Sequence, residues 1–520
     1  AIHACADFAA DKGMTVFTGG QTLDEWSQMA EIWFWLMEQY EIGNPPEEAV
    51  QHLKKLEGIM RQSDFDMTIP ELLRGCIDHL NDVMAHTNQP DALRRLMDES
   101  VLFTRASCTC PLCTPSRASL ATGRYPSRCG VPIHDAVLPP EQPTFYQALR
   151  DSGYRVGIVG KTDLHKRDTY CGVKGDLPSM YHYGFTDPVE TEGKMNSAWY
   201  GTNPDGSIYP MGPYQKYLMD KDSELMRTLE KDYRSYMRQK PRYHAQPSVL
   251  PDEVFLDTFI GEKSLEWLNE HDNTGAPWHL TVSFAGPHNP WDPPKEDYDA
   301  VGDTLWPDPI PNDMEGKPAW IRRRAAQQTG GMTQADLQQV KRCYAGSVRV
   351  IDRWIGKLLD WLETSGHKDD TVVIFCADHG ELLGDHGLLE KSCMYEGCLR
   401  IPLLVHLPGM TQRRDSDALA ELMDLAPTCL ELAGVDWNRR EMDAVSLVPV
   451  LNGSTEPLRP VQRSELHNCT MLFDGRYKWI RSYNDTDELY DLETDPQELH
   501  NVINEHPEVL DRMRPYSFRH

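Results

Sequence analysis

The sequence has no long hydrophobic run and no excess of positive charge, and each absence excludes a class of protein. No stretch of the 520 residues approaches the ~18 consecutive apolar residues that span a bilayer, so no membrane-spanning segment is predicted. Lys and Arg number 52 and Asp and Glu number 80, which gives a net charge of −28. Because this charge repels polyanions, we predict no nucleic-acid partner, although one local basic pocket for a small anion is compatible with it.

Cysteine is scarce, and a secretory leader is missing from the sequence as it stands. Thirteen cysteines are too few for a disulfide-stapled scaffold, and their odd number leaves at least one thiol unpaired within one chain. Residues 1–20 lack a basic segment followed by an apolar one, which predicts a cytoplasmic location for this form. With 40% hydrophobic and 25% charged residues, the composition is that of a globular protein of about three domains.

Three sections follow one another along the chain. Residues 1–86 carry three amphipathic helical patterns and are predicted to form a helical N-terminal section of unknown role. From residue 87 to 455, short apolar runs alternate with helical patterns, which predicts an α/β fold with a doubly wound, mostly parallel sheet sandwiched by helices. Residues 456–520 are predicted to form a small α+β C-terminal subdomain with short antiparallel strands. The runs expected as strands in the middle section are 101–103, 156–159, 280–284, 372–375 and 402–405, and the expected helices are 144–151, 265–270 and 335–363.

Polar side chains follow three of these apolar runs. In doubly wound sheets, ligands bind beyond the carboxyl ends of the strands, so residues just after each run are candidates for a site. These candidates are Lys161 and His165 after the second run, His288 after the third, and Asp378, His379 and the more distant Lys391 after the fourth.

A further cluster lies at the predicted start of a helix. Thr114 is expected as the N-cap and Pro115 as the first helical residue, which places Cys113 at the positive end of the helix. Arg117 adds a positive charge one turn into that helix. A nucleophile beside an anion-binding helix start suits attack on a sulfate or phosphate ester.

Two other interpretations of the cysteines remain open at this point. Cys110 and Cys113 have the C-x-x-C spacing of a thiol–disulfide oxidoreductase. Together with Cys108 and Cys129 they offer four thiols for zinc, at an irregular spacing. Neither interpretation gives a role to the polar residues at the strand ends, and buried structural thiols are the default expectation for Cys108, Cys110 and Cys129.

Residues 113–123, Cys-Thr-Pro-Ser-Arg-Ala-Ser-Leu-Ala-Thr-Gly, resemble the signature of the type I sulfatases in the alkaline phosphatase superfamily. The resemblance continues in the same order to about residue 510 through the segments 103–106, 159–161, 287–290, 378–381, 395–397 and 488–492. It implies an alkaline phosphatase-like fold and hydrolysis of a sulfate monoester of a small molecule or a carbohydrate.

The resemblance also implies roles for particular residues. A maturation enzyme would oxidise Cys113 to formylglycine, whose hydrate supplies the nucleophilic oxygen. Lys161 and Lys391 would bind the sulfate oxygens, and Arg117 would steady residue 113. His288 would protonate or orient the leaving alcohol. A divalent metal, usually Ca²⁺, would be held by Asp378, His379 and residue 113.

Three departures from the family pattern keep alternatives open. His379 stands where many sulfatases have Asn, as in phosphonate and phosphate monoester hydrolases, which often use Mn²⁺. His165 comes four residues after Lys161, whereas the family usually has Lys-x-His. The family's first strand, which ends in two metal-binding Asp residues, is not found before residue 87. An inactive sulfatase-like binding protein with an incomplete metal site is therefore a further alternative, and the sequence leaves the oligomeric state open.

Overall fold

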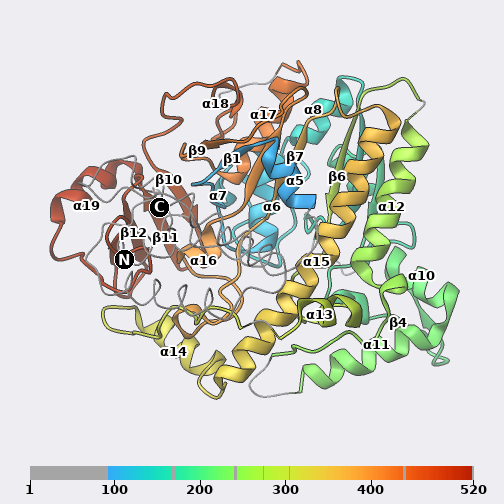
Figure 1. Ribbon diagram of the computed structural model, residues 1–520, viewed down its shortest axis with the longest axis horizontal. Helices are drawn as coiled ribbons and strands as arrows, with labels where there is room; N and C mark the ends of the chain where they lie inside the picture. Colours follow the sequence, from blue (N-terminus) through green and yellow to red (C-terminus); the bar gives the residue numbers. More distant parts are fainter. Residues whose placement is uncertain are drawn as a thin grey trace, which may run out of the picture. The chain divides into compact units, whose positions relative to one another are not determined.

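The computed structural model describes residues 92–165, 170–238, 243–272, 274–303, 305–436 and 441–517 (Figure 1). All of them belong to one unit of the chain, Leu72–His520. The predicted helical section 1–86 and the segment behind the cytoplasmic prediction lie outside the described residues. None of the described helices has the length and apolar character to cross a membrane.

One sheet has the strand order β7-β8-β1-β9. It contains β1 (Val101–Phe103), β7 (Val373–Cys376), β8 (Leu403–His406) and β9 (Arg414–Ser416). β1 and β9 are parallel, whereas β8 runs antiparallel to both β1 and β7. The run 402–405 is thus a strand as predicted, but it does not share the parallel direction expected for it. A fully buried apolar run has no pattern that distinguishes the two directions.

A second sheet, β3-β2-β6, is entirely parallel. It contains β2 (Arg155–Gly160), β3 (Asp187–Glu190) and β6 (Trp278–Ser283). Helix α12 (Leu256–His271) packs against β2 and β6, and α8 (Phe145–Asp151) packs against β2 through a separate hydrophobic cluster. Parallel strands with helices confirm the predicted α/β class.

The long helix α15 (Gln334–Ser365) packs against α12 and is the longest described element (Figure 1). It begins with a capping box between Thr333 and Asp336 and ends at Gly366, whose φ is 86°. The predicted helices 144–151 and 335–363 match α8 and α15 closely. The predicted helix 265–270 is only the last part of α12, because the earlier turns bury polar side chains, Asp257, Thr258 and Ser264, beside apolar ones and so show no simple apolar stripe.

The remaining helices and strands of residues 87–455 complete this section of the chain. They are α5 (Ala92–Asp98), α6 (Cys113–Thr122), α7 (Pro126–Cys129), α9 (Pro178–His182), β4 (Gly201–Thr202), β5 (Ile208–Tyr209), α10 (Pro213–Lys221), α11 (Ser223–Tyr236), α13 (Lys295–Val301), α14 (Ala319–Gln328), α16 (Glu396–Leu399), α17 (Leu425–Leu432) and α18 (Val448–Leu451).

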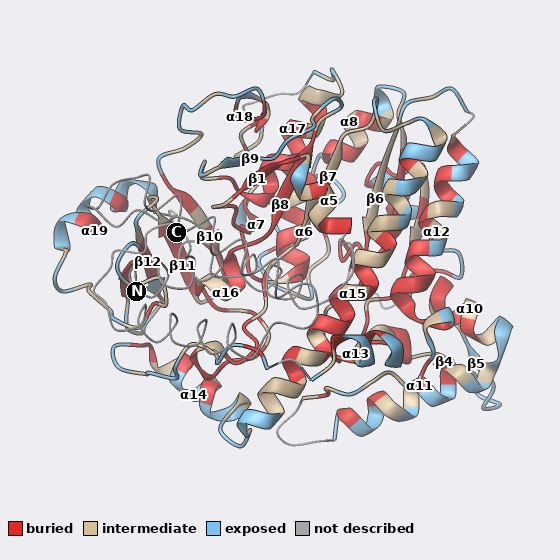
Figure 2. Cartoon of the chain, viewed as in Figure 1, coloured by how far each residue is buried: buried red, intermediate tan, exposed pale blue. Residues whose placement is uncertain are grey.

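Two strands have open edges. Among the described residues, β6 pairs with β2 alone and β7 pairs with β8 alone. Figure 2 shows β6 and β7 mostly in tan, as half-buried strands, whereas β8 is buried along its length. The polar residues that follow β6 and β7 therefore lie beside sheet edges that the described residues leave unpaired.

The tail of the chain forms a four-stranded antiparallel sheet, β10-β11-β12-β13. Its strands are β10 (Gln462–Glu465), β11 (Cys469–Phe473), β12 (Tyr477–Ser482) and β13 (Glu488–Asp491). Helix α19 (Pro507–Met513) packs on this sheet through Val509 and Met513. The antiparallel strands expected here are present, while the boundary at 455/456 stays a prediction.

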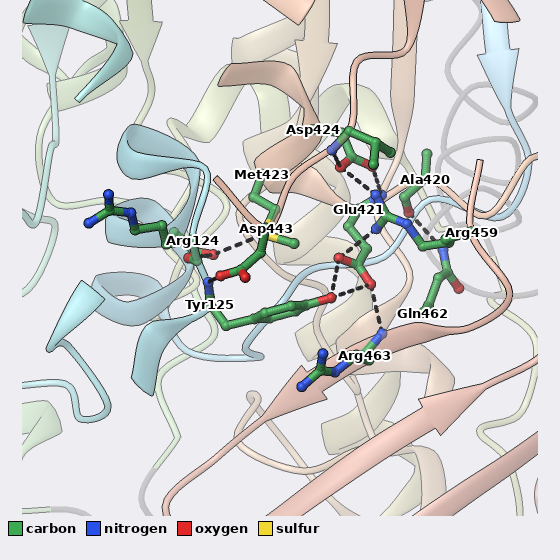
Figure 3. A network of polar contacts seen from close by, with 12 residues as sticks. Arg124, Tyr125, Ala420, Glu421, Met423, Asp424, Asp443, Arg459, Gln462 and Arg463 are labelled. Atoms are coloured by element: carbon green, nitrogen blue, oxygen red, sulfur yellow. Dashed lines mark hydrogen bonds and ion pairs between the residues drawn. The ribbon is translucent and has the colours of Figure 1, made fainter. Parts of the chain in front are cut away.

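A buried polar junction connects the catalytic section to the start of this antiparallel sheet (Figure 3). Arg459 contacts Glu421 and Asp424 at 2.5 Å each, and both carboxylates are fully buried. The hydroxyl of Tyr125, which follows α6, donates to Glu421 at 2.9 Å, and the backbone N–H of Arg463 donates to the same carboxylate at 2.7 Å. The junction thus anchors the end of the helix that begins with Cys113.

Arg459→Met is expected to lower the free energy of unfolding by about 3–5 kcal/mol, because it leaves two buried carboxylates without their cation. Burial raises the pKa of Glu421 and Asp424, and Arg459 opposes the shift. Carboxyls with a raised pKa take up protons in the folded state first, so the loss of stability should shrink as the pH falls from about 7 towards 5. Urea unfolding at both pH values measures this effect.

Arg413→Met is the matched control, since Arg413 forms an exposed ion pair with Asp415 at 2.6 Å. Its replacement should change the stability by less than about 1 kcal/mol. Equal losses in the two variants would show that the junction contributes no more than a surface ion pair.

Candidate active site

Cys113 is the first residue of α6, at the positive end of the helix as predicted, but the predicted cap is wrong. The N-cap is Leu112, with φ −157° and ψ 130° and no side-chain cap, and not Thr114. The N–H of Ser116 donates to the carbonyl of Leu112 at 3.0 Å, so the helix begins one residue before Thr114. Pro115 lies within the first turn, where its missing N–H breaks no intrahelical bond.

Arg117 connects the carboxyl ends of three strands. Its guanidinium donates to the Asp378 carboxylate after β7 at 2.7 Å, to the Lys161 carbonyl after β2 at 2.8 Å and to the Ser283 hydroxyl of β6 at 2.8 Å. Burial opposes ionisation of Asp378, but Arg117 and His379 outweigh it and hold the pKa of this carboxyl well below its usual range. Arg117 therefore fixes a charged Asp378 beside the start of α6.

Cys113, Asp378 and His379 form a group that can hold a metal ion. One ligand atom from each lies within 4.8 Å of the others. The His379 Nε2 atom is 3.2 Å from the Cys113 Sγ atom, and its Nδ1 atom is 2.8 Å from the Gly380 carbonyl. This bond places a proton on Nδ1 and turns Nε2 towards Cys113, an orientation typical of metal-binding histidines. The donors present therefore fit part of a divalent metal site.

Two lysines provide the positive charge around Cys113. Burial opposes ionisation of the thiol, but Lys161, Lys391 and His379 outweigh it and lower its pKa well below the usual value. The Lys161 ammonium is 3.0 Å from the Asp163 carboxylate, and the pair is buried. Several positive charges therefore stabilise an anion at position 113. The same charges could stabilise the negative charge that develops on the group transferred from an ester.

His288 lies between Lys391 and Cys113. Its Nε2 atom is 2.7 Å from the Lys391 ammonium, and its Nδ1 atom is 2.5 Å from the Asn289 carbonyl. Burial first, and the Lys391 charge second, lower the pKa of His288 to about 3, while a hydrogen bond with Cys113 opposes the shift. His288 is accordingly a neutral imidazole that accepts a hydrogen bond from Lys391.

His165 has a different environment from the other candidates. Its ring contacts the carboxylate of Glu190 at the end of β3, and this carboxylate also accepts a hydrogen bond from Thr162. The structure thus assigns His165 a contact with a neighbouring strand end, and its proposed catalytic role stays a prediction.

Two residues that support the site, Ser283 and Asp163, carry no motif that identifies them in the sequence. Ser283 belongs to no motif, but its hydroxyl accepts a hydrogen bond from Arg117. Its position near the end of a predicted strand is the same signal that identified His288. Asp163 lies within the polar run after β2, and the sequence does not distinguish it from its neighbours there. The folded structure does so through its ion pair with Lys161.

The cysteine alternatives lack support in the described part of the chain. Cys108, Cys110 and Cys129 are buried, and together with Cys113 they form no metal-binding group among the described residues. Cys129 contacts the Pro126 carbonyl at 3.5 Å, and no disulfide joins Cys110 to Cys113. The structure groups Cys113 with Asp378 and His379 and leaves the other three as the structural thiols expected by default.

Comparison with known proteins identifies the family of the chain. The sulfatase family model matches residues 79–435, more than half of the chain, and the model for the C-terminal region of N-sulphoglucosamine sulphohydrolase matches residues 384–514. Choline-sulfatase of Rhizobium meliloti is 28% identical over 471 residues, covering 86% of this chain and 85% of that protein. Residues 1–78 lie outside both family matches.

Solved structures show the same fold. Phosphonate monoester hydrolase from Silicibacter pomeroyi superposes with a TM-score of 0.66 at 22% identity, covering 82% of this chain and 88% of that one. A protein in complex with its substrate D-glucosamine-2-N,6-O-disulfate has a TM-score of 0.64 at 20% identity, covering 82% and 91%. At these identities the structures establish the fold alone.

The chain belongs to the sulfatase family, the type I sulfatases of the alkaline phosphatase superfamily that the sequence resembled. It is a sulfatase, an enzyme that hydrolyses sulfate esters, and the predicted fold, family and class of reaction are confirmed.

Proposed function

We propose that this sulfatase cleaves a sulfate monoester with residue 113, as the formylglycine made from Cys113, as its nucleophile. The observation that carries the proposal is the convergence of Cys113, Asp378 and His379 within 4.8 Å beside two lysines. A thiol–disulfide oxidoreductase would need a second cysteine in this place, whereas a metal-assisted hydrolase needs this combination of carboxylate, imidazole and cations.

Each residue of the site has a role in this proposal. Lys161 and Lys391 bind the oxygens of the sulfate group, and Arg117 holds both Asp378 and the strand end that carries Lys161. His288, whose Nε2 atom is 2.7 Å from the Lys391 ammonium, protonates or orients the leaving alcohol. The roles of Lys161, Lys391 and His288 come from the family resemblance, and the short distance between Lys391 and His288 supports them.

A divalent metal, Ca²⁺ in our proposal, would be held by Asp378, His379 and residue 113. When bound, it supplies a positive charge that polarises the sulfate ester. The Oδ2 atom of Asp378 accepts a hydrogen bond from Arg117, which holds this carboxylate in place as one of the residues that would bind the metal. The two further Asp ligands that the family has before residue 87 are not recognised in this sequence, and that part of the chain lies outside the described residues.

The substrate class follows from the anion pocket and from the relatives. One relative is a choline-sulfatase, and one structural neighbour was solved with a disulfated glucosamine, so we propose a small-molecule or carbohydrate sulfate ester. A formylglycine-generating maturation enzyme is the partner that the mechanism requires.

Two alternatives remain testable. The imidazole of His379 is a better ligand for Mn²⁺ than for Ca²⁺, and a phosphonate monoester hydrolase shares the fold, which favours phosphonate or phosphate ester hydrolysis as the second candidate. A sulfatase-like binding protein without activity would result if the metal site stayed incomplete.

A comparison of three matched substrates tests the proposal. An aryl sulfate should be hydrolysed with a kcat/KM at least about tenfold above those of the aryl phosphate and aryl phosphonate, with Ca²⁺ supporting more activity than Mn²⁺. Preference for the phosphonate with Mn²⁺ would select the second candidate. Absence of all three activities, with Cys113 fully converted and neither Ca²⁺ nor Mn²⁺ bound in titrations, would select the binding protein.

A further inference from the structure

The loop that carries Lys391 has an unusual backbone. Leu383, His386, Glu390 and Ser392 all have positive φ values, of 47°, 54°, 64° and 75°. Residues with side chains seldom adopt this conformation, because the Cβ atom approaches the backbone carbonyl. Such a loop keeps its shape only when contacts from outside hold it.

Those contacts come from helix α14. Arg324 donates from one guanidinium nitrogen to the Ser392 carbonyl at 3.0 Å and from another to the carbonyls of Leu389, at 3.0 Å, and Lys391. A single side chain thus binds the carbonyls of Leu389, Lys391 and Ser392. Arginine is suited to this role because its planar guanidinium presents five N–H donors in fixed directions.

Two more side chains at the end of α14 bind the same loop. The N–H of Leu389 donates to the Gln328 side-chain carbonyl at 3.0 Å, and the Thr329 hydroxyl donates to the Gly387 carbonyl at 2.7 Å. On the opposite side, the N–H of Ser392 donates to the Pro111 carbonyl at 3.0 Å, two residues before Cys113. The loop is therefore fixed between α14 and the segment that leads into the nucleophile.

We propose that Arg324 is a positioning residue that holds the Lys391 ammonium in the active site. The inference rests on the proposed function, in which Lys391 binds the sulfate group. Arg324 bonds to the backbone on both sides of Lys391, and the Lys391 ammonium reaches His288 at 2.7 Å. Arg324 itself acts on the loop backbone, so its effect on catalysis passes through Lys391.

Kinetics of Arg324→Met and Arg324→Lys test this role. Arg324→Met should lower kcat/KM for an aryl sulfate by about tenfold to a hundredfold, with most of the change in kcat, because a misplaced Lys391 loses its transition-state contact. Arg324→Lys should recover part of the activity, since an ammonium still reaches one carbonyl. Arg323→Met, at an exposed position of the same helix, is the matched control and should be unaffected.

A double variant separates positioning from general stability. In a Lys391→Ala background, Arg324→Met should change kcat/KM by less than about twofold, since its target is already absent. An undiminished tenfold effect in that background would overturn the proposal, as would full activity of Arg324→Met with native stability.

Hydrogen exchange provides a measurement that needs no catalytic activity. In Arg324→Met, peptides covering residues 387–392 should exchange at least about tenfold faster than in the unaltered enzyme, while Arg324→Lys exchanges at an intermediate rate and Arg323→Met is unchanged. Unchanged exchange in Arg324→Met would refute the positioning role even if the enzyme hydrolysed none of the tested esters. Absence of activity with altered exchange would refute the proposed function and retain the role of Arg324.

Discussion

Replacing Cys113 with alanine is expected to abolish sulfate ester hydrolysis, with a fall in kcat/KM of about 10³-fold or more. The change removes the nucleophile and one of the three donors that converge on the metal position. It leaves the start of α6 and its neighbours in place, because Cys113 contributes no cap to the helix. Steady-state hydrolysis of an aryl sulfate measures the effect.

Cys110→Ala is the matched control for this prediction. Cys110 is equally buried, lies three residues away and belongs to the C-x-x-C pair, yet it has no place in the proposed mechanism. It should retain activity, and in a host with the maturation enzyme the Cys113 peptide should show oxygen in place of sulfur by mass spectrometry. An intact Cys113 thiol that cycles with Cys110, and a loss of function in both variants, would support an oxidoreductase instead.

The strand-end residues could be predicted because parallel topology brings distant segments to one edge. Lys161 and His288 follow β2 and β6, which are neighbours in one parallel sheet, and Asp378 follows β7. Their convergence depends on topology rather than on local sequence, so the alternation of apolar runs and helical patterns sufficed to expect it. The strand direction of β8 could not be expected in the same way, because its apolar run is compatible with either direction.

Residues that act through backbone contacts had no signal in the sequence. Arg324 is 67 positions from Lys391 and belongs to a helix with no motif, so only the folded arrangement shows that it binds three carbonyls of the loop. The prediction of Thr114 as the N-cap of α6 was wrong for a related reason. Thr114 has the chemistry of an N-cap, but the carbonyl of Leu112 already accepts the first helical hydrogen bond, and side-chain preference is the weaker influence.

Lys391→Ala is expected to lower kcat/KM for an aryl sulfate by about 10²–10³-fold, the usual effect of removing one preorganised donor from a developing anion. The ammonium is buried and 2.7 Å from the His288 imidazole, so its loss removes a charge from the pocket and the group that orients His288. Lys368→Ala is a suitable control, because Lys368 forms exposed ion pairs with Glu99 and Glu363 and should leave the kinetics unchanged.

The size of this effect on different substrates shows which ester the pocket is built for. A sulfate monoester carries one negative charge at neutral pH and a phosphate monoester nearly two, so removal of a cation should harm phosphate binding more if phosphate is the better-matched substrate. Because Arg117 and Lys161 already pair with Asp378 and Asp163, Lys391 is the cation of the pocket whose partner is a neutral imidazole. We therefore expect the sulfate reaction to depend on Lys391 through kcat rather than KM. A larger loss for the phosphonate or phosphate, with Mn²⁺ as the better metal, would identify the site as a phosphoester hydrolase and make His379 the residue to exchange for Asn.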